Sequence, residues 1–182
     1  MQTIKQLRHV LEAVADEDNY LFLLADLHGA LPNTSYDALR AVVSRAEREG
    51  MLQRVCRGLY LYPGVDYPRG LVLHHAAAKL RAHEFNYISL ESALSDAGLI
   101  SQIPLNWITL MSSGRSQVLA CGDFGTIEFI HTRKQPAALY DELTYDARCS
   151  LWRASVALAL RDMKATRRNR DLIDWEALDE FV

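Results

Sequence analysis

The stretch MLQRVCRGLYLYPG, residues 51–64, decides how the first part of this chain folds. Two short runs suited to β-strands, residues 52–56 and 58–62, meet at Arg57-Gly58, where the glycine favours a tight turn. In the second run leucines alternate with tyrosines, as in a strand that has two different faces. The stretch therefore predicts a β-hairpin.

The alternation also predicts which side chains hold the hairpin in place. Leu59 and Leu61 fall on one side of the second strand, and Tyr60 and Tyr62 fall on the other. We expect the leucines, together with Val55, to pack against a helical core.

A helix precedes the hairpin and has clear signals at both ends. Ser35 is suited to cap its amino terminus, Asp37 lies in the first turn where the helix dipole favours a negative charge, and Gly50 ends it. One face carries an apolar stripe at helical spacing, which predicts a buried side. The stripe consists of Leu39, Val42, Val43 and Ala46.

The opposite face of this helix has the composition of a DNA-reading surface. Ala41 and Ser44 are short enough to let a backbone approach the bases, and arginines flank them. The predicted DNA-binding residues are Ser35, Arg40, Ser44, Arg45 and Arg48 in or above the major groove, with Arg54 and Arg57 on adjacent phosphates. A solvated helix face is the alternative, and Glu47 and Glu49 favour it because they would repel phosphates.

The elements upstream complete the prediction for the first domain. Apolar residues at helical spacing predict a helix over residues 4–14, and a short helix is expected at residues 24–30, before Pro32. Three helices followed by a hairpin is the layout of a winged helix-turn-helix, a DNA-binding fold. We assign residues 1–64 to this domain.

A second domain is predicted over residues 65–182, after the proline- and glycine-rich segment PGVDYPRG, residues 63–70. Helices and strands both follow, so the fold class of the whole chain is α+β. The expected helices cover residues 71–82, 90–97, 148–166 and 175–181, and the expected strands cover residues 87–88, 106–111, 117–121 and 126–131.

Composition narrows the class of protein. The chain has 182 residues, 49% of them hydrophobic and 24% charged, with a net charge of −3, as in a folded globular protein. No apolar run is long enough to span a membrane, so we expect a cytoplasmic protein without a membrane partner. Positive charge is concentrated locally, because residues 35–57 contain five arginines and three acidic residues.

Signals for catalysis or metal binding are weak. Cys56, Cys121 and Cys149 are far apart, so we expect buried apolar side chains rather than a disulfide framework or a metal site. Asp123 and Glu128 have a spacing reminiscent of metal-dependent nucleases, but the lysine such sites use is missing. We expect a solvent-facing Glu128, no catalytic residue, no bound metal and no cofactor.

A second basic stretch, RDMKATRRNRD, covers residues 161–171. Its cations are Arg161, Lys164, Arg167, Arg168 and Arg170. Positive charges favour the carboxyl end of a helix, so a solvated helix end explains them. The functional alternative is a second patch that contacts phosphates, or a surface for a protein or RNA partner.

Three segments resemble one known family. REGMLQRVCRGLYLYPG at residues 48–64, YISLESALSDAGLI at residues 87–100 and GTIEFIHT at residues 125–132 are similar to the AbiEi-type antitoxins of bacterial type IV toxin-antitoxin systems, which act in abortive infection. The similarity extends from about residue 5 to residue 165.

This resemblance implies two functions in one chain. The winged helix would bind promoter DNA, with inverted repeats as the expected operator, and repress its own operon. The second domain would counteract a nucleotidyltransferase-like toxin, without necessarily touching it. Either a monomer or a dimer formed on DNA fits the sequence. The alternatives are a winged-helix regulator or protein-interaction adaptor without a toxin partner, and a nuclease with an unfamiliar site.

Overall fold

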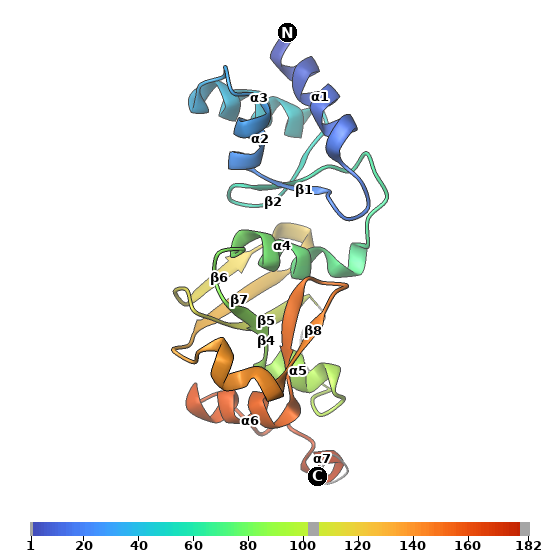
Figure 1. Cartoon of the computed structure of the whole chain (residues 1–182). Helices are drawn as coiled ribbons and strands as arrows, with labels where there is room; N and C mark the ends of the chain where they lie inside the picture. Colours follow the sequence, from blue (N-terminus) through green and yellow to red (C-terminus); the bar gives the residue numbers. More distant parts are fainter. Residues whose placement is uncertain (1, 102–105, 179–182) are drawn as a thin grey trace. The chain divides into compact units, whose positions relative to one another are not determined.

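The chain divides into two compact units, Met1–Val72 and Leu73–Val182, shown in a computed structural model that describes residues 2–101 and 106–178 (Figure 1). The division falls at Val72, within the predicted second domain and beyond the proline- and glycine-rich segment. Part of that segment packs on the first unit, because the ring of Tyr67 stacks on that of Tyr20 at 4.9 Å between centroids. Residues 65–72 are thus a docked extension of the first unit.

The first unit consists of helices and a small antiparallel sheet. Its elements are α1 (Gln2–Val14), β1 (Leu21–Leu23), α2 (Leu24–Ala30), α3 (Tyr36–Arg48), β2 (Gln53–Cys56) and β3 (Leu59–Leu61). The helices lie where the sequence predicted them. Among the described residues the strands form a three-stranded sheet in the order β1-β3-β2, in which β1 is an addition to the predicted hairpin.

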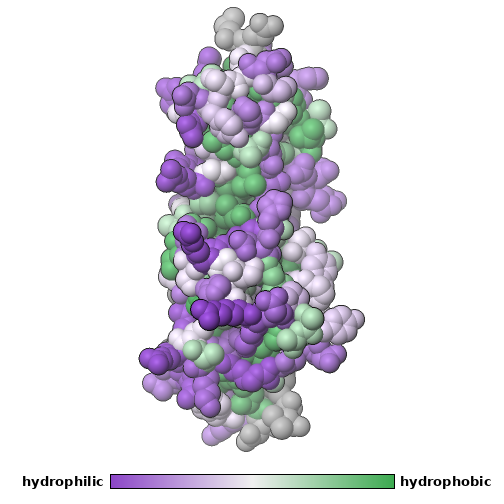
Figure 2. Space-filling model, turned by 60° about the vertical axis from the view of Figure 1, so that its left-hand side comes forward, coloured by the Kyte–Doolittle hydropathy of each residue, from purple (hydrophilic) through white to green (hydrophobic). Residues whose placement is uncertain are grey.

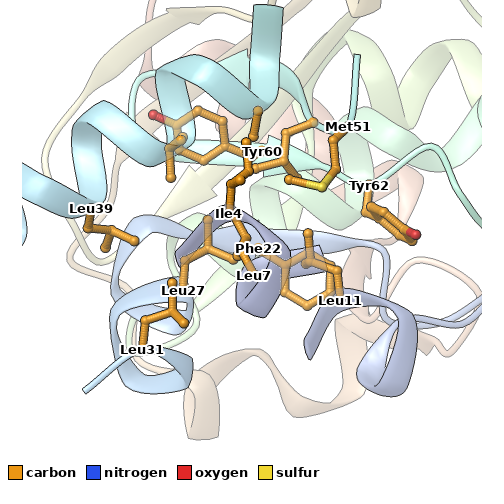
Figure 3. Close-up of a cluster of buried hydrophobic side chains, with 13 residues drawn as sticks. Ile4, Leu7, Leu11, Phe22, Leu27, Leu31, Leu39, Met51, Tyr60 and Tyr62 are labelled. Atoms are coloured by element: carbon orange, nitrogen blue, oxygen red, sulfur yellow. The ribbon is translucent and has the colours of Figure 1, made fainter. Parts of the chain in front are cut away.

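The helices bury their apolar stripes in a single core (Figure 3). It is built from residues of α1, α2, α3 and the sheet, and Figure 3 shows their side chains converging. Its buried members are Ile4, Leu7, Leu11, Phe22, Leu27, Leu31, Leu39, Val43, Ala46, Met51, Leu52, Tyr60 and Tyr62. Burial of this much apolar side chain is the main stabilising contribution to the unit.

The hairpin joins this core through its tyrosines, so the prediction that Leu59 and Leu61 do so is wrong. Tyr60 and Tyr62 belong to the helical core, whereas Leu59 and Leu61 are also buried but lie on the opposite face of β3. Val55, expected in the same core, is buried but is not a member of it either. Because both faces of the strand are covered, the alternation of leucine and tyrosine carried no contrast between a core face and a solvent face.

The second unit is built on a larger, mixed sheet. Among the described residues its strands form a six-stranded sheet in the order β6-β7-β5-β4-β9-β8, and Figure 1 shows α4 on one face with α5 and α6 on the other. A 3-10 turn η1 (Arg69–Leu71) at the end of the first unit leads into α4 (Val72–Leu80), which belongs to the second unit from Leu73 on. The other elements of the second unit are β4 (Asn86–Ile88), α5 (Leu90–Asp96), β5 (Trp107–Ser112), β6 (Gln117–Ala120), η2 (Gly122–Phe124), β7 (Thr126–His131), η3 (Pro136–Glu142), β8 (Leu143–Asp146), β9 (Leu151–Ala154), α6 (Val156–Ala165) and α7 (Trp175–Leu178).

The expected helix over residues 148–166 is wrong in its first half. Residues 151–154 form β9, which pairs in parallel with β4 and antiparallel with β8. The helix begins only after Ser155, whose hydroxyl accepts a hydrogen bond from the amide of Leu158 at 3.2 Å. Residues 179–181 of the expected last helix lie outside the described residues.

A buried polar cluster fixes α6 against the sheet. Asp162 is fully buried, and its carboxylate accepts hydrogen bonds from Tyr87 at 3.0 Å and Ser89 at 2.8 Å. The ammonium of Lys134 lies 2.6 Å from its other oxygen. Burial, followed by the nearby carboxylate, raises the pKa of Tyr87, so this phenol stays protonated as a donor.

Candidate nucleic-acid interface

Helix α3 presents the predicted reading face to solvent. Leu39, Val43 and Ala46 are buried, so the opposite side of the helix must face outward. The exposed residues on that side are Asp37, Arg40, Ala41, Ser44, Arg45 and Arg48. This matches the pattern of short central side chains flanked by arginines.

Ser35 has a structural task at the start of this helix. Its hydroxyl accepts a hydrogen bond from the amide of Ala38 at 3.3 Å, which satisfies one of the free amides of the first turn. At the other end Gly50 has a φ of +72°, a conformation that favours glycine. The caps set where the reading face begins and ends.

The arginines of α3 are only loosely held by carboxylates. Arg40 pairs with Asp37 at 3.0 Å, and Arg45 pairs with Glu49 at 2.7 Å. Both pairs are exposed, with 64% of the Arg40 side chain and 48% of the Arg45 side chain accessible. Such pairs contribute little to stability and exchange readily for other anions. Arg48 makes no ion pair within the described residues.

The hairpin supplies two more exposed arginines. Arg54 lies on β2 opposite Tyr60, and Arg57 lies in the turn before Gly58, whose φ is +82°. A register shift between Arg54 and Cys56 marks a bulge in β2. Within residues 2–101 and 106–178 neither arginine forms an ion pair. Both cations are therefore available to an anionic partner.

The ring of Tyr60 links the helix and the hairpin. Burial raises the pKa of Tyr60, Glu47 raises it further, and Arg54 and Arg40 lower it. Charges of α3 and of β2 therefore act on the same phenol. Glu47 acts on it with the opposite sign to the arginines, and its negative charge weakens the attraction for phosphates.

A stacked pair of aromatic rings at the amino end of α3 was not predicted from the sequence. The rings of His28 in α2 and Tyr36 in α3 lie 4.1 Å apart between centroids at an interplanar angle of 12°, and Tyr36 is 47% exposed. The signal was an aromatic residue at the first position of α3, with a histidine at the end of the helix before it. The pair adds an aromatic surface beside Arg40.

The second basic stretch is largely engaged inside its own unit. Arg168 is three-quarters buried and pairs with Glu91 at 3.1 Å and Glu128 at 2.7 Å, and Arg161 pairs with Glu142. Burial opposes the charge of Arg168, but these carboxylates outweigh it and raise its pKa. The remaining cations, Lys164, Arg167 and Arg170, are exposed and make no ion pair in the described part of the chain.

The expectation of a solvent-facing Glu128 is wrong, because Glu128 is the largely buried ion-pair partner of Arg168. Its side chain is only 15% exposed, and besides Arg168 it accepts a hydrogen bond from the indole of Trp107 at 3.2 Å. Among the described residues no group of three or more His, Cys, Asp and Glu side chains is placed to hold a metal ion. Cys56, Cys121 and Cys149 are buried, as predicted.

Hydrophilic side chains are spread over the visible surface of each unit, with apolar ones between them (Figure 2). Hydrophilicity alone therefore does not mark an interface, and the availability of each arginine has to be judged from its partners. Among the described residues no helix is long and apolar enough to cross a membrane.

The fold is mixed α+β. No protein-family model matches the chain, and no curated protein matches it. Among solved structures it is similar to the Rv2827c protein from Mycobacterium tuberculosis, with 14% sequence identity and a TM-score of 0.54. The similarity covers 94% of this chain and 64% of that one. At this identity the likeness concerns the fold alone.

Proposed function

We propose that the first unit is a winged helix-turn-helix that binds double-stranded DNA. The observation that carries this proposal is that exposed arginines of α3 and of the β2-β3 hairpin both act on Tyr60: Arg54 is its cross-strand partner, and Arg54 and Arg40 both lower its pKa. In such folds a helix enters the major groove while the wing contacts the backbone. Here α3 would be the reading helix, and Arg57 would lie at the tip of the wing.

The order of elements supports the same proposal. The helices α1, α2 and α3 come before the β2-β3 hairpin, and β1 adds a strand to it. The contacts divide into two kinds: Arg40, Ser44, Arg45 and Arg48 would reach base edges or flanking phosphates, and Arg54 and Arg57 would neutralise phosphates. Ser35 would contribute through its cap rather than by contact.

We further propose that the protein is an antitoxin of the AbiEi type, without catalytic activity of its own. Three sequence segments carry that resemblance, and an α+β second unit is consistent with it. The first unit would repress its own operon at inverted repeats, as a monomer or as a dimer formed on DNA. The second unit would counteract a nucleotidyltransferase-like toxin.

A second candidate is an adaptor that uses the same surface for a protein. The carboxylates within the arginine cluster favour it, because Asp37 and Glu49 already pair with two arginines and Glu47 lies beside Tyr60. A protein partner with both acidic and basic groups complements a surface of mixed charge better than a phosphate backbone does.

A gel-shift titration with DNA from upstream of the reading frame tests the DNA proposal. The double variant Arg40→Ala, Arg48→Ala should weaken binding at least tenfold, since each lost phosphate or base contact costs on the order of 1 kcal/mol or more. The matched control is Lys5→Ala, Arg8→Ala, which removes the same charge from exposed positions of α1. Equal affinities of the two double variants would refute the assignment of α3.

Salt dependence separates the two candidates. With phosphate contacts the logarithm of affinity falls linearly with the logarithm of salt concentration, whereas an apolar protein interface responds weakly.

The antitoxin role is tested by co-expression with a neighbouring nucleotidyltransferase-like gene product. Growth should recover with the wild-type chain and with the Arg40→Ala, Arg48→Ala variant. Failure of both would contradict the antitoxin role while leaving DNA binding standing.

A further inference from the structure

The second unit contains a small open cavity beside the β8-β9 edge of its sheet. Its volume is about 170 Å³. The lining residues come from α4, the loop after it, β4 and the β8-β9 hairpin, and they include Arg81, Glu84, Phe85, Tyr145, Ser150 and Trp152. The candidate DNA surface uses none of these residues, because it lies in the other unit.

Aromatic rings form one wall of this cavity. Tyr145 and Trp152 are cross-strand partners on β8 and β9, with ring centroids 5.2 Å apart at an angle of 63°. They remain 51% and 37% exposed, although rings of this size are ordinarily buried further. Phe85 adds a third ring. The cavity therefore offers exposed ring surface on which a flat ligand can stack.

Most polar groups in the cavity already have partners. Arg81 donates to the hydroxyl of Ser112 at 2.8 Å and to the carbonyl of Arg115 at 2.6 Å, and its guanidinium stacks on Phe129 at 3.9 Å. The amide of Asn86 donates to the carbonyls of Arg81 and Glu84, at 2.9 Å each, and accepts from Ser112 at 2.6 Å. These side chains shape the cavity but have few hydrogen bonds left to offer.

Glu84 and Ser150 differ from them. One carboxylate oxygen of Glu84 accepts from Ser113 at 2.8 Å. The other makes no hydrogen bond or ion pair with the described residues, although the carboxylate interacts electrostatically with Arg81. The hydroxyl of Ser150 likewise has no partner there, and this residue is held at a φ of 56°, a backbone conformation uncommon outside glycine. The cavity thus presents a carboxylate oxygen and a hydroxyl next to the edge-to-face pair of Tyr145 and Trp152.

We propose that this cavity binds one unpaired nucleobase of a single-stranded nucleic acid, with guanine preferred. The base would stack on one ring of the edge-to-face pair of Tyr145 and Trp152, as bases do on the aromatic side chains of single-strand binders. Guanine carries adjacent N–H donors on its pairing edge, which match the free acceptor of Glu84.

The size and charge of the cavity favour this ligand over others. Sites for larger ligands usually measure about 300 Å³ or more, so a cavity of about 170 Å³ suits a single ring system. Arg81 and Glu84 both line the cavity, so their charges offset each other and no excess positive charge draws a phosphate into it. This binding is independent of the proposed double-stranded DNA binding, because the residues of the two sites lie in different units.

Nuclear magnetic resonance on the ¹⁵N-labelled full chain provides the test. The indole N–H signal of Trp152, assigned by its absence in Trp152→Phe, should shift with millimolar guanosine monophosphate and less with the adenosine, cytidine and uridine monophosphates. The signals of Trp107 and Trp175 should stay in place. A short single-stranded RNA containing one guanine should produce the same shift at lower concentration.

Variants separate the contributions. Tyr145→Ala should weaken binding about tenfold through lost stacking, whereas Tyr140→Ala, which alters a 77% exposed tyrosine outside the cavity, should leave it unchanged. Glu84→Gln should keep binding but remove the preference for guanine.

The proposal is overturned if no nucleotide moves the Trp152 signal, if all three indole signals move alike, or if only a lysine or arginine peptide moves it. Operator binding by the Tyr145→Ala variant should be normal, so this site and the DNA surface can fail separately.

Discussion

Two arginine-rich regions of this chain look alike in sequence and differ in structure. In the first unit Arg48, Arg54 and Arg57 have no ion-pair partner within the described residues, and Arg40 and Arg45 have only exposed ones. In the second unit Arg168 is enclosed by two carboxylates, one of them 40 residues away in the sequence. Basic composition therefore does not identify a nucleic-acid surface; the partners brought by distant strands decide which cations are free.

The largest effect should come from the acid inside the second basic region. Asp162→Ala leaves the ammonium of Lys134 and the hydroxyls of Tyr87 and Ser89 without their shared acceptor. We expect a loss of about 3–5 kcal/mol in the free energy of unfolding, as for other broken buried pairs. Urea unfolding followed by tryptophan fluorescence measures it, because Trp107, Trp152 and Trp175 all lie in the second unit.

Asp171→Ala is the matched control, because Asp171 is an exposed acid of the same basic stretch. It should change stability by no more than about 0.5 kcal/mol. If both variants unfold at the same urea concentration, the buried cluster contributes no net stability, and the contrast between the two regions would rest on Arg168 alone.

Arg168→Ala should come next, at about 2–4 kcal/mol. It leaves Glu91 and Glu128, which are 22% and 15% exposed, as unpaired carboxylates in partly buried positions. The same fluorescence measurement applies, with Arg167→Ala as the exposed neighbour that should change stability by less than about 0.5 kcal/mol. Equal effects of the two substitutions would mean that the second region is as loosely held as the first.

The sequence was sufficient where local signals agree. The cap at Ser35, the apolar stripe from Leu39 to Ala46 and the glycine at position 50 located α3, and the turn at Gly58 located the hairpin. Each of these signals acts within a few residues, so one sequence is enough to find it.

The sequence was insufficient where the interacting residues are far apart along the chain. Residues 151–154 have no strong preference for strand, and pairing with β4 and β8 makes them β9. The burial of Glu128 depends on Arg168, and the cavity at Tyr145 and Trp152 depends on β8 and β9, two strands that the sequence did not predict. The candidate DNA surface was foreseeable because it lies on one helix and one hairpin.

Arg161→Ala should have a smaller effect than Arg168→Ala. Arg161 pairs with Glu142, but its side chain is 53% exposed and that of its partner 29%. Water can therefore replace most of the lost interaction, and we expect about 0.5–1 kcal/mol by the same urea experiment. A loss as large as that of Arg168→Ala would show that exposure does not govern the strength of these pairs.

The smallest effect on stability should come from the first unit. Arg40→Ala or Arg45→Ala breaks only an exposed pair within α3, so the free energy of unfolding should change by less than about 0.5 kcal/mol in a thermal melt followed by circular dichroism.

If these arginines contact phosphates, each substitution should also lower the slope of log affinity against log salt by about one. Stability and binding would then separate in the first unit, whereas Arg168→Ala should destabilise the second unit and leave DNA affinity unchanged. An unchanged salt slope after both α3 substitutions would place these arginines away from the phosphates, and their exposure would reflect only a solvated helix face.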